Sequence, residues 1–220
     1  MDYRHRYIDG TLCSFPPGKA VCVGRNYADH IRELQNETPD SPLLFLKPAT
    51  AFQALQEPIR LPCHGKVCHH EVEIALLIGK HLQKATASKA NDSIAGYGIA
   101  LDLTLRDVQQ KCRQKGHPWE IAKGFDGSCP ISPFISPDHF GSANGIPFRL
   151  SVNGTVRQTG NSDRMIAGFT ELLIYASSIF TLVPGDVLLT GTPAGVDSLK
   201  SGDRLELELK GEYLFETYVS

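Results

Sequence analysis

The chain has 220 residues, of which 41% are hydrophobic and 21% charged, enough for one globular domain with its own core. Its 22 basic and 24 acidic residues give a formal net charge of -2 without a long block of one sign, which argues against a nucleic-acid or anionic-membrane surface. No window approaches about 20 continuous apolar residues, and the charged start MDYRHRYIDG lacks the apolar stretch of a secretory signal. We therefore expect a soluble cytoplasmic protein whose partners are small molecules or a second copy of itself.

Residues 1–18, which end in FPPG, are predicted to form an N-terminal arm, and residues 19–220 a single domain. The six cysteines are scattered too thinly for a disulfide scaffold and are expected to be reduced thiols. A short strand over residues 19–23 is predicted to lead through a glycine turn into a helix. That helix is expected to begin near Asn26, a good N-cap residue.

The middle of the chain is predicted to be mostly extended. Two short pieces fenced by prolines, residues 43–51 and 58–62, precede a strand over residues 69–80. Residues 96–116 are predicted to form a strand followed by a helix, with Thr104 and Asp107 in the spacing of a capping pair.

The last third of the chain shows many short strands with turn signals. Asn153 and Gly154 predict a tight hairpin within residues 148–160, and only residues 165–180 carry a helical apolar stripe. Many short strands with few helices predict a β-rich α+β fold rather than a Rossmann-type alternation.

Two carboxylates stand at the start of the otherwise apolar strand over residues 69–80. Side chains alternate along a strand, so Glu71 and Glu73 should share a face, roughly 6 to 7 Å apart. Like charges at this spacing repel when they are desolvated, so either one glutamate is protonated or a cation lies between them.

Asp102 interrupts the apolar sequence IALDLTL, where a lone carboxylate is costly unless it has an ionic partner. Together with Glu71 and Glu73 it would make an all-oxygen set suited to a hard divalent ion such as Mg²⁺ or Mn²⁺. The alternative is that these acids pair with arginines such as Arg106 or face solvent.

His30 and Glu33 are three residues apart on the first predicted helix, so they share a face. A carboxylate that orients an imidazole and raises its basicity is one way to build a general base for water. The alternative is an ordinary helix surface.

A second ligand cluster lies just upstream of the two glutamates. It consists of soft ligands that zinc favours: Cys63, His64, Cys68, His69 and His70. The spacing is loose and no second ligand pair of comparable quality occurs, so a non-enzymatic protein with structural zinc stays a remote alternative. Support of another site or surface exposure suits these histidines better.

Six motifs, taken in order, resemble the fumarylacetoacetate hydrolase family from about residue 19 onward: VCVGRNYADH, LLFLKP, HHEVEIALLIG, ALDLTLRDVQ, PWEIAKGFDGSCP and LLTGTPAGV. The resemblance is greatest to its short single-domain branch of acylpyruvate hydrolases and oxaloacetate decarboxylases. It implies a fumarylacetoacetase C-terminal-type fold, a mixed β-sandwich or roll with a few peripheral helices, in a catalytic domain over residues 19–220. It also implies a homodimer.

The resemblance implies a Mg²⁺ or Mn²⁺ ion held by Glu71, Glu73 and Asp102. It places the family's His-x-x-Glu dyad on His30 and Glu33, in a segment that forms a lid, and its active-site lysine on Lys123. The metal ligands and the dyad that the residues suggested by themselves agree with these positions.

The expected reaction is hydrolysis of the C-C bond of an acylpyruvate such as fumarylpyruvate or acetylpyruvate. Water activated by His30 would attack the distal carbonyl, while a divalent ion stabilises the pyruvate enolate that leaves. Lys123 would supply positive charge and Gln109 a donor for the oxyanion. Arg25 and Thr192 are expected to bind the substrate carboxylate.

The alternative reactions on the same site are decarboxylation or keto-enol tautomerisation of oxaloacetate, which need no hydrolytic water. One departure from the family concerns the turn that contains Thr192. Relatives often continue it with a glycine where this chain has Asp197, which puts substrate contacts at that point in doubt.

Overall fold

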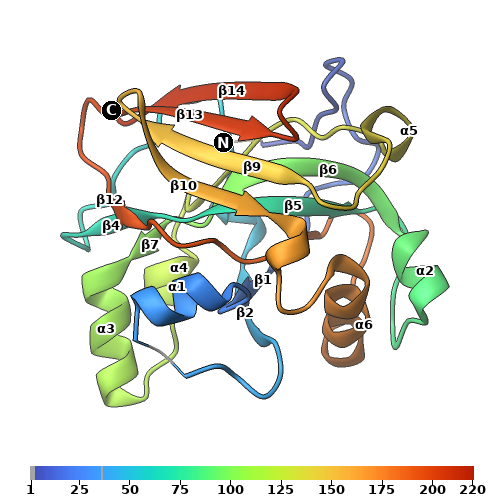
Figure 1. Ribbon diagram of the computed structural model, residues 1–220, viewed down its shortest axis with the longest axis horizontal. Coiled ribbons are helices and arrows are strands. Elements are labelled where there is room, and N and C mark those ends of the chain that lie inside the picture. Colours follow the sequence, from blue (N-terminus) through green and yellow to red (C-terminus); the bar gives the residue numbers. More distant parts are fainter. Residues whose placement is uncertain (1–2, 36) are drawn as a thin grey trace.

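The computed structural model describes residues 3–35 and 37–220 and shows a β-rich α+β fold, which confirms the predicted fold class. The described residues form six α-helices, which lie outside the sheets (Figure 1). They are α1 (Ala28–Glu33), α2 (Ala87–Asn91), α3 (Arg106–Lys115), α4 (Glu120–Lys123), α5 (Pro137–Phe140) and α6 (Phe169–Ile179). In the described part of the chain, none of them is long and apolar enough to cross a membrane.

A mixed seven-stranded sheet forms the centre of the molecule. Its strands in spatial order are β2 (Leu43–Lys47), β1 (Ala20–Gly24), β11 (Val187–Leu189), β5 (Val72–Ile78), β6 (Ile94–Leu101), β8 (Cys129–Ile131) and β3 (Phe52–Ala54). Every residue of β5 is buried, because one face packs in the main core and the other in a second cluster that includes Ala75 and Leu77. Burial on both faces explains why β5 is a continuous apolar run after Glu73.

A four-stranded antiparallel sheet packs over the first, as Figure 1 shows at the top of the molecule. Its order is β10 (Thr155–Asn161), β9 (Pro147–Val152), β13 (Arg204–Leu209) and β14 (Tyr213–Tyr218). Leu205, Leu207 and Leu209 alternate with exposed or half-buried residues and point into the core. The predicted hairpin is confirmed, since Asn153 and Gly154 join β9 to β10 with positive φ values of 52° and 75°.

The third sheet contains β12 (Asp197–Ser198), β4 (Cys68–His70) and β7 (Thr104–Leu105). Its presence corrects the single strand predicted over residues 69–80, because that segment leaves one sheet and enters another at Glu71. Asp102 lies in the matching break between β6 and β7. The two breaks are adjacent, since the Asp102 N–H donates to the Glu71 carbonyl oxygen at 2.8 Å.

Both predicted helix N-caps are wrong. Tyr27 is the N-cap of α1, and the Asn26 side chain instead bonds to the backbone of Ala167 and Thr190. The N-cap of α3 is Leu105, without a side-chain cap.

Thr104 and Asp107 therefore do not form a capping pair. Thr104 donates its hydroxyl to the Asp102 carbonyl oxygen, whereas the Asp107 carboxylate accepts from the N–H groups of Lys66 and Val67. Asp107 thus ties the loop before β4 to α3. The predicted end of α3 is confirmed, because Gly116 is its C-cap with φ 65°.

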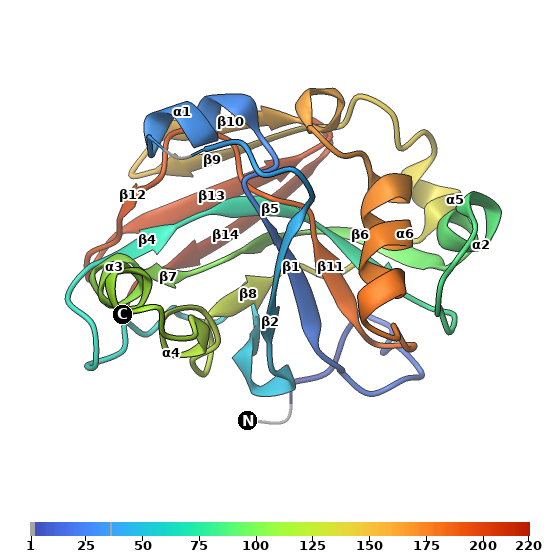
Figure 2. The same ribbon diagram turned by 90° about the horizontal axis from the view of Figure 1, so that it is seen from below.

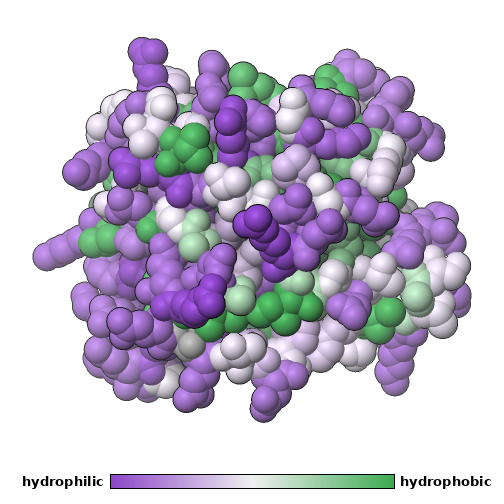
Figure 3. Space-filling model, viewed as in Figure 1, coloured by the Kyte–Doolittle hydropathy of each residue, from purple (hydrophilic) through white to green (hydrophobic). Residues whose placement is uncertain are grey.

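The helices are distributed around the central sheet. Seen from below, α3 and α4 lie on one side of β1 and β2, and α6 and α2 on the other (Figure 2). The residues between Tyr3 and Gly18 pack along the domain, and His5 is fully buried among Tyr3, Phe52 and Phe134. The face seen in Figure 1 is mostly polar, with apolar side chains in small separate groups (Figure 3).

Candidate metal centre and active site

Three buried carboxylates converge where the two breaks between sheets meet. Glu71, Glu73 and Asp102 are 5%, 2% and 1% exposed, and each offers an oxygen atom within 4.8 Å of the other two. The structure thus brings together the three acids that the sequence singled out. In the described part of the chain, they are the only group of three His, Cys, Asp or Glu side chains with ligand atoms this close.

Two buried lysines supply positive charge to this acid cluster. Lys123 Nζ, from the C-terminal end of α4, lies 2.9 Å from Glu71 Oε2 and 2.6 Å from Asp102 Oδ2. Lys47 Nζ, at the end of β2, lies 2.8 Å from Asp102 Oδ1 and donates to the Ser128 carbonyl oxygen at 3.1 Å. Lys123 is therefore no surface lysine, and Lys47 is a second charged group that sequence reasoning missed.

Arg106 and Gln109 lie on one face of α3 beside the acid cluster. The Arg106 guanidinium forms an ion pair with Glu71 and donates to Gln109 Oε1 at 2.7 Å. The alternative that acids pair with Arg106 is thus correct for Glu71, while Asp102 pairs with lysines. Because Gln109 uses its oxygen for Arg106, its NH₂ group is the end that can donate to a substrate oxygen.

The charges of the cluster shift its pKa values in opposite directions. Burial acts to raise the pKa of Glu71, but attraction by Lys123 and Arg106 outweighs it and holds that pKa below its usual range. Burial, reinforced by repulsion from Asp102 and Glu71, raises the pKa of Glu73 well above its usual range. Burial alone would lower the pKa of Lys123, but Asp102 and Glu71 raise it, so this lysine stays protonated.

The partners of Glu73 and Asp102 show whether the three carboxylates suit a bound cation. The Glu73 carboxylate accepts from the Gly191 N–H at 2.7 Å, and no ion pair joins it to a cation of the described chain. Asp102 Oδ1 is close to Lys47 Nζ but not in hydrogen-bond geometry with it, so it is a buried oxygen without a hydrogen bond. Buried carboxylate oxygens with incomplete partners, gathered around one point, fit a hard divalent ion.

The predicted dyad is present on α1. His30 Nδ1 lies 3.1 Å from Glu33 Oε2, and the His30 side chain is 7% exposed. His30 is near enough to the acid cluster to contribute to the lowered pKa of Glu71. His30 therefore belongs to the buried site, whereas Glu33 is an exposed residue of α1 whose carboxylate reaches the imidazole.

Thr192 lies beside the acid cluster, in the turn that follows β11. Its hydroxyl donates to the Val72 carbonyl oxygen at 2.9 Å, so that hydrogen is engaged with the protein. The guanidinium of Arg25, a residue with a positive φ of 59°, donates to the Glu37 carbonyl oxygen at 3.1 Å. Carboxylate binding by Thr192 and Arg25 remains a prediction.

The soft ligands proposed as a zinc site do not come together. Cys63 is exposed and Cys68 is buried, while His64 bonds to the Ile121 carbonyl oxygen and His70 to Gln158 Oε1. All six cysteines are free thiols, as predicted. Asp197, which stands where relatives often have glycine, pairs with His70 across β12 and β4 and thus belongs to the third sheet.

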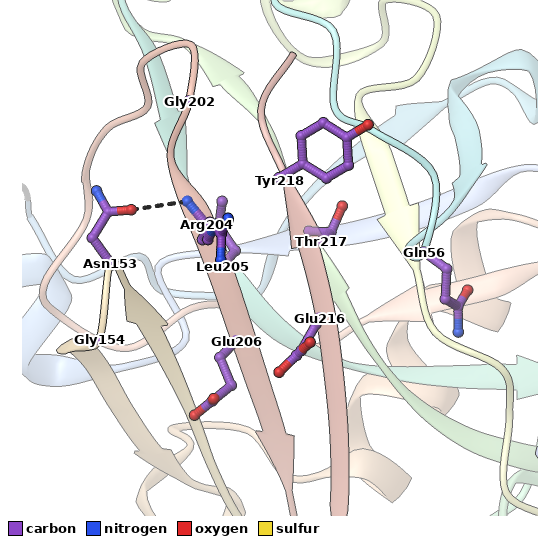
Figure 4. Close-up of a pocket in the computed structure, with 10 residues that line it drawn as sticks. All are labelled: Gln56, Asn153, Gly154, Gly202, Arg204, Leu205, Glu206, Glu216, Thr217 and Tyr218. Atoms are coloured by element: carbon purple, nitrogen blue, oxygen red, sulfur yellow. Dashed lines mark hydrogen bonds between the residues drawn. The ribbon is translucent and has the colours of Figure 1, made fainter.

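A cavity of about 740 Å³ lies elsewhere, on the four-stranded sheet (Figure 4). Its lining includes Arg204, Glu206, Glu216 and Tyr218 on β13 and β14. None of the acid cluster, the lysines or the dyad contributes to it. Two glutamates that face each other across neighbouring strands, without a gathered set of catalytic groups, do not make it a reaction site.

A buried acid triad, two buried lysines and a His-Glu dyad on a β-rich fold define a metal-dependent enzyme. Residues 19–218 match the family described as fumarylacetoacetate (FAA) hydrolase C-terminal, and the chain belongs to this family.

Individual relatives are similar over nearly their whole length. The chain is 49% identical to oxaloacetate tautomerase YcgM of Escherichia coli (strain K12), over 96% of this chain and 97% of the relative. A crystal structure of a fumarylacetoacetate hydrolase family protein from Yersinia pestis is 46% identical, with a TM-score of 0.96, covering 99% of this chain and 100% of that one. Fumarylpyruvate hydrolase of Pseudomonas aeruginosa, solved with Mn²⁺ and pyruvate, is 32% identical. Its structure has a TM-score of 0.93 and covers 99% of this chain and 95% of that one.

Proposed function

We propose that this chain is a divalent-metal-dependent oxaloacetate keto-enol tautomerase. The observation that carries the proposal is the buried cluster of Glu71, Glu73 and Asp102, whose oxygens converge beside protonated Lys123. The choice of substrate is supported by the relative that is 49% identical and named an oxaloacetate tautomerase. This reverses the order of the expected activities, since tautomerisation was the alternative and acylpyruvate hydrolysis the first expectation.

The acid cluster would hold Mg²⁺ or Mn²⁺, and the bound ion would stabilise the negative charge that develops on the keto oxygen of the substrate. Its all-oxygen donor set favours these hard ions over zinc. The Mn²⁺ found with the Pseudomonas aeruginosa fumarylpyruvate hydrolase is consistent with this choice.

The protein's own groups can then carry out the isomerisation. Tautomerisation breaks one C3–H bond and forms one O–H bond, with no net gain of water or loss of carbon. His30, oriented by Glu33, can take the C3 proton and return it to the oxygen.

The cationic groups have a separate role in binding. Lys123 has a raised pKa, so it acts as a cation for the substrate and not as a base. Arg106 adds a planar guanidinium suited to a carboxylate, and the Gln109 amide can donate to the developing oxyanion. Both carboxylates of oxaloacetate would thus meet positive charge.

A second candidate is hydrolysis of acylpyruvates, and the formed His30 and Glu33 dyad favours it. The same imidazole could activate a water molecule for attack on the distal carbonyl. The fumarylpyruvate hydrolase that is 32% identical supports this candidate.

The test is a substrate panel on Mg²⁺-loaded protein. Oxaloacetate, fumarylpyruvate and acetylpyruvate are supplied in turn, and enol absorbance and pyruvate release are recorded separately. We expect accelerated keto-enol interconversion of oxaloacetate without a matching release of pyruvate. Faster pyruvate release from either acylpyruvate than tautomerisation of oxaloacetate would reverse the ranking, and pyruvate formed from oxaloacetate would indicate decarboxylation.

A further inference from the structure

Gln158 is a fully buried amide on β10 whose four hydrogen-bonding positions are all used. Its Oε1 accepts from His70 Nδ1 at 2.9 Å and from the Val72 N–H at 3.1 Å. Its Nε2 donates to Thr192 Oγ1 and to the Pro193 carbonyl oxygen, both at 2.8 Å. One side chain therefore joins the strand break around Glu71 to the turn that follows β11.

A bulge in β10 directs this side chain inward. The register between β10 and β9 shifts between Val156 and Gln158, so Arg157 is the extra residue. Arg157 is exposed, whereas Gln158 is 1% exposed and contacts Val72, the residue between Glu71 and Glu73. Gly195 packs directly on the bulge, since a Cβ there would lie 2.0 Å from the Arg157 carbonyl oxygen.

The turn that Gln158 contacts, residues 191–195, contacts both the acid cluster and the dyad of His30 and Glu33. At its start, the Gly191 N–H donates to Glu73 Oε2 at 2.7 Å. At its end, the Gly195 N–H donates to Glu33 Oε1 at 2.9 Å. Glu33 uses its other oxygen for His30, so the turn spans from the acid cluster to the dyad.

We propose that Gln158 is the positioning residue of this site, which fixes the 191–195 turn and through it the carboxylates of Glu73 and Glu33 together. Gln158 is not one of the reacting groups, because all four hydrogen-bonding positions of its amide are used within the protein. The assignment rests on the proposed function only in that Glu73 and Glu33 act in the reaction. The geometry of the turn can be tested without substrate or metal.

The first experiment is hydrogen exchange on the metal-free protein, with Gln158→Met. Methionine preserves the volume of the side chain but removes all four hydrogen bonds. We expect amide exchange in residues 191–195 to become about tenfold faster or more, while β5 and β6 keep their protection. Unchanged exchange in the turn, or an equal increase along the whole chain, would overturn the assignment.

The matched control is Gln53→Met, which removes another buried amide. Gln53 is 7% exposed and donates to the carbonyl oxygens of Glu57 and Pro58 at 3.1 and 2.9 Å. We expect this variant to leave exchange in residues 191–195 and turnover unchanged. If it loosens the turn as much as Gln158→Met does, the effect of Gln158 is general destabilisation and the proposal is wrong.

Gln158→Glu allows the ionised and protonated forms of one variant to be compared. This test can be done even if Gln158→Met does not fold. Its carboxylate could still accept from Val72 and His70 but would face the oxygens of Thr192 and Pro193 without a proton to donate. Burial among these acceptors would raise its pKa, and protonation would restore one donor. We expect turn protection relative to the native chain to recover as the pH falls, and an absence of pH dependence would contradict the positioning role.

Turnover supplies the last measurement. In Mg²⁺-loaded Gln158→Met, kcat/KM for oxaloacetate should fall roughly 10- to 100-fold, because both carboxylates lose their fixed positions. Native kcat/KM with a loosened turn would overturn the role in catalysis. If the native chain itself does not act on oxaloacetate, the proposed function fails, while the exchange experiments still decide what Gln158 does.

Discussion

Lys123 Nζ lies 2.6 Å from Asp102 Oδ2, and both side chains are almost completely buried. The same ammonium group reaches Glu71 Oε2 at 2.9 Å, so one lysine connects two of the three acids. A buried charge that loses its partner is strongly destabilising, whereas a cation supplied from solution can replace that partner. Lys123 should therefore influence stability and metal affinity in opposite directions.

Replacement of Lys123 by Met should lower the free energy of unfolding of the metal-free protein by about 3 to 5 kcal/mol, because two buried carboxylates lose their ammonium partner. Mn²⁺ should bind the variant more tightly than the native chain, since a competing positive charge is gone. Urea unfolding in EDTA and Mn²⁺ titration measure the two effects. Lys66→Met, at an exposed lysine, is the control. Weaker Mn²⁺ binding in Lys123→Met would contradict this account of the charges.

Glu73→Gln should separate metal binding from folding. Burial and the charges of Asp102 and Glu71 raise the pKa of Glu73, so a neutral amide is tolerated without metal and the free energy of unfolding in EDTA should not fall. Mn²⁺ affinity should drop by roughly 100-fold or more, because a ligand carboxylate is lost. Mg²⁺-stimulated turnover should disappear with it.

Glu120→Gln, an exposed acid on α4, serves as the control for Glu73→Gln. Both proteins are compared by circular dichroism, urea unfolding and Mn²⁺ titration. Undiminished Mn²⁺ affinity in a folded Glu73→Gln protein would remove Glu73 from the metal centre.

The acid cluster could be predicted because burial of a carboxylate is unfavourable, and the sequence shows which carboxylates lie within apolar strands. A carboxylate within an apolar strand needs an ionic partner wherever that strand ends up, which identified Glu71, Glu73 and Asp102. The same reasoning applies to Lys47 in LLFLK, which is fully buried and was overlooked. Buried charges of either sign are thus the strongest local signal for this site.

The features that could not be predicted depend on partners far along the chain. Asn26 has the residue type of an N-cap, but it bonds to Ala167 and Thr190, 141 and 164 residues away. Gln158 reaches Thr192 only because of a bulge that a strand pattern does not show. The β-rich fold class, in contrast, follows from turn residues and alternation along the chain, which are local properties.

His30→Ala should distinguish the reactions that this site can support. Tautomerisation and acylpyruvate hydrolysis both need a proton carrier, so both rates should fall by about 10²- to 10⁴-fold. Decarboxylation of oxaloacetate requires only stabilisation of the enolate charge and should be spared. Mn²⁺ affinity, measured in parallel, should remain close to that of the native chain because His30 is not among the three acids.

Glu33→Gln is the companion variant to His30→Ala. Glutamine can keep a hydrogen bond to the His30 ring but lacks the negative charge that faces the ring when it has taken a proton. We expect an intermediate loss of tautomerisation in this variant. Equal loss of decarboxylation and tautomerisation in His30→Ala would contradict the division of roles between the dyad and the acid cluster.

His5 should make the stability of the protein dependent on pH. Its ring is fully buried, with Nε2 3.0 Å from the Gly185 carbonyl oxygen and Nδ1 3.0 Å from the Tyr3 hydroxyl, which suits the neutral form. Burial lowers the pKa of His5 to about 4 in the folded chain, against 6.5 for an ordinary histidine. Between these values the unfolded chain binds the extra proton, so stability is intact above pH 6.5 and is lost progressively toward pH 4.

Removing the titrating ring tests this dependence. From pH 7 to pH 5, the free energy of unfolding of the native chain should fall by about 2 kcal/mol more than that of His5→Gln, since each pH unit below 6.5 costs about 1.4 kcal/mol. Urea unfolding in EDTA at both pH values measures the difference, and other titrating groups cancel in the comparison. His139→Gln, at an exposed histidine, should behave like the native chain. An equal pH dependence in the native chain and His5→Gln would mean that burial does not lower the pKa of His5.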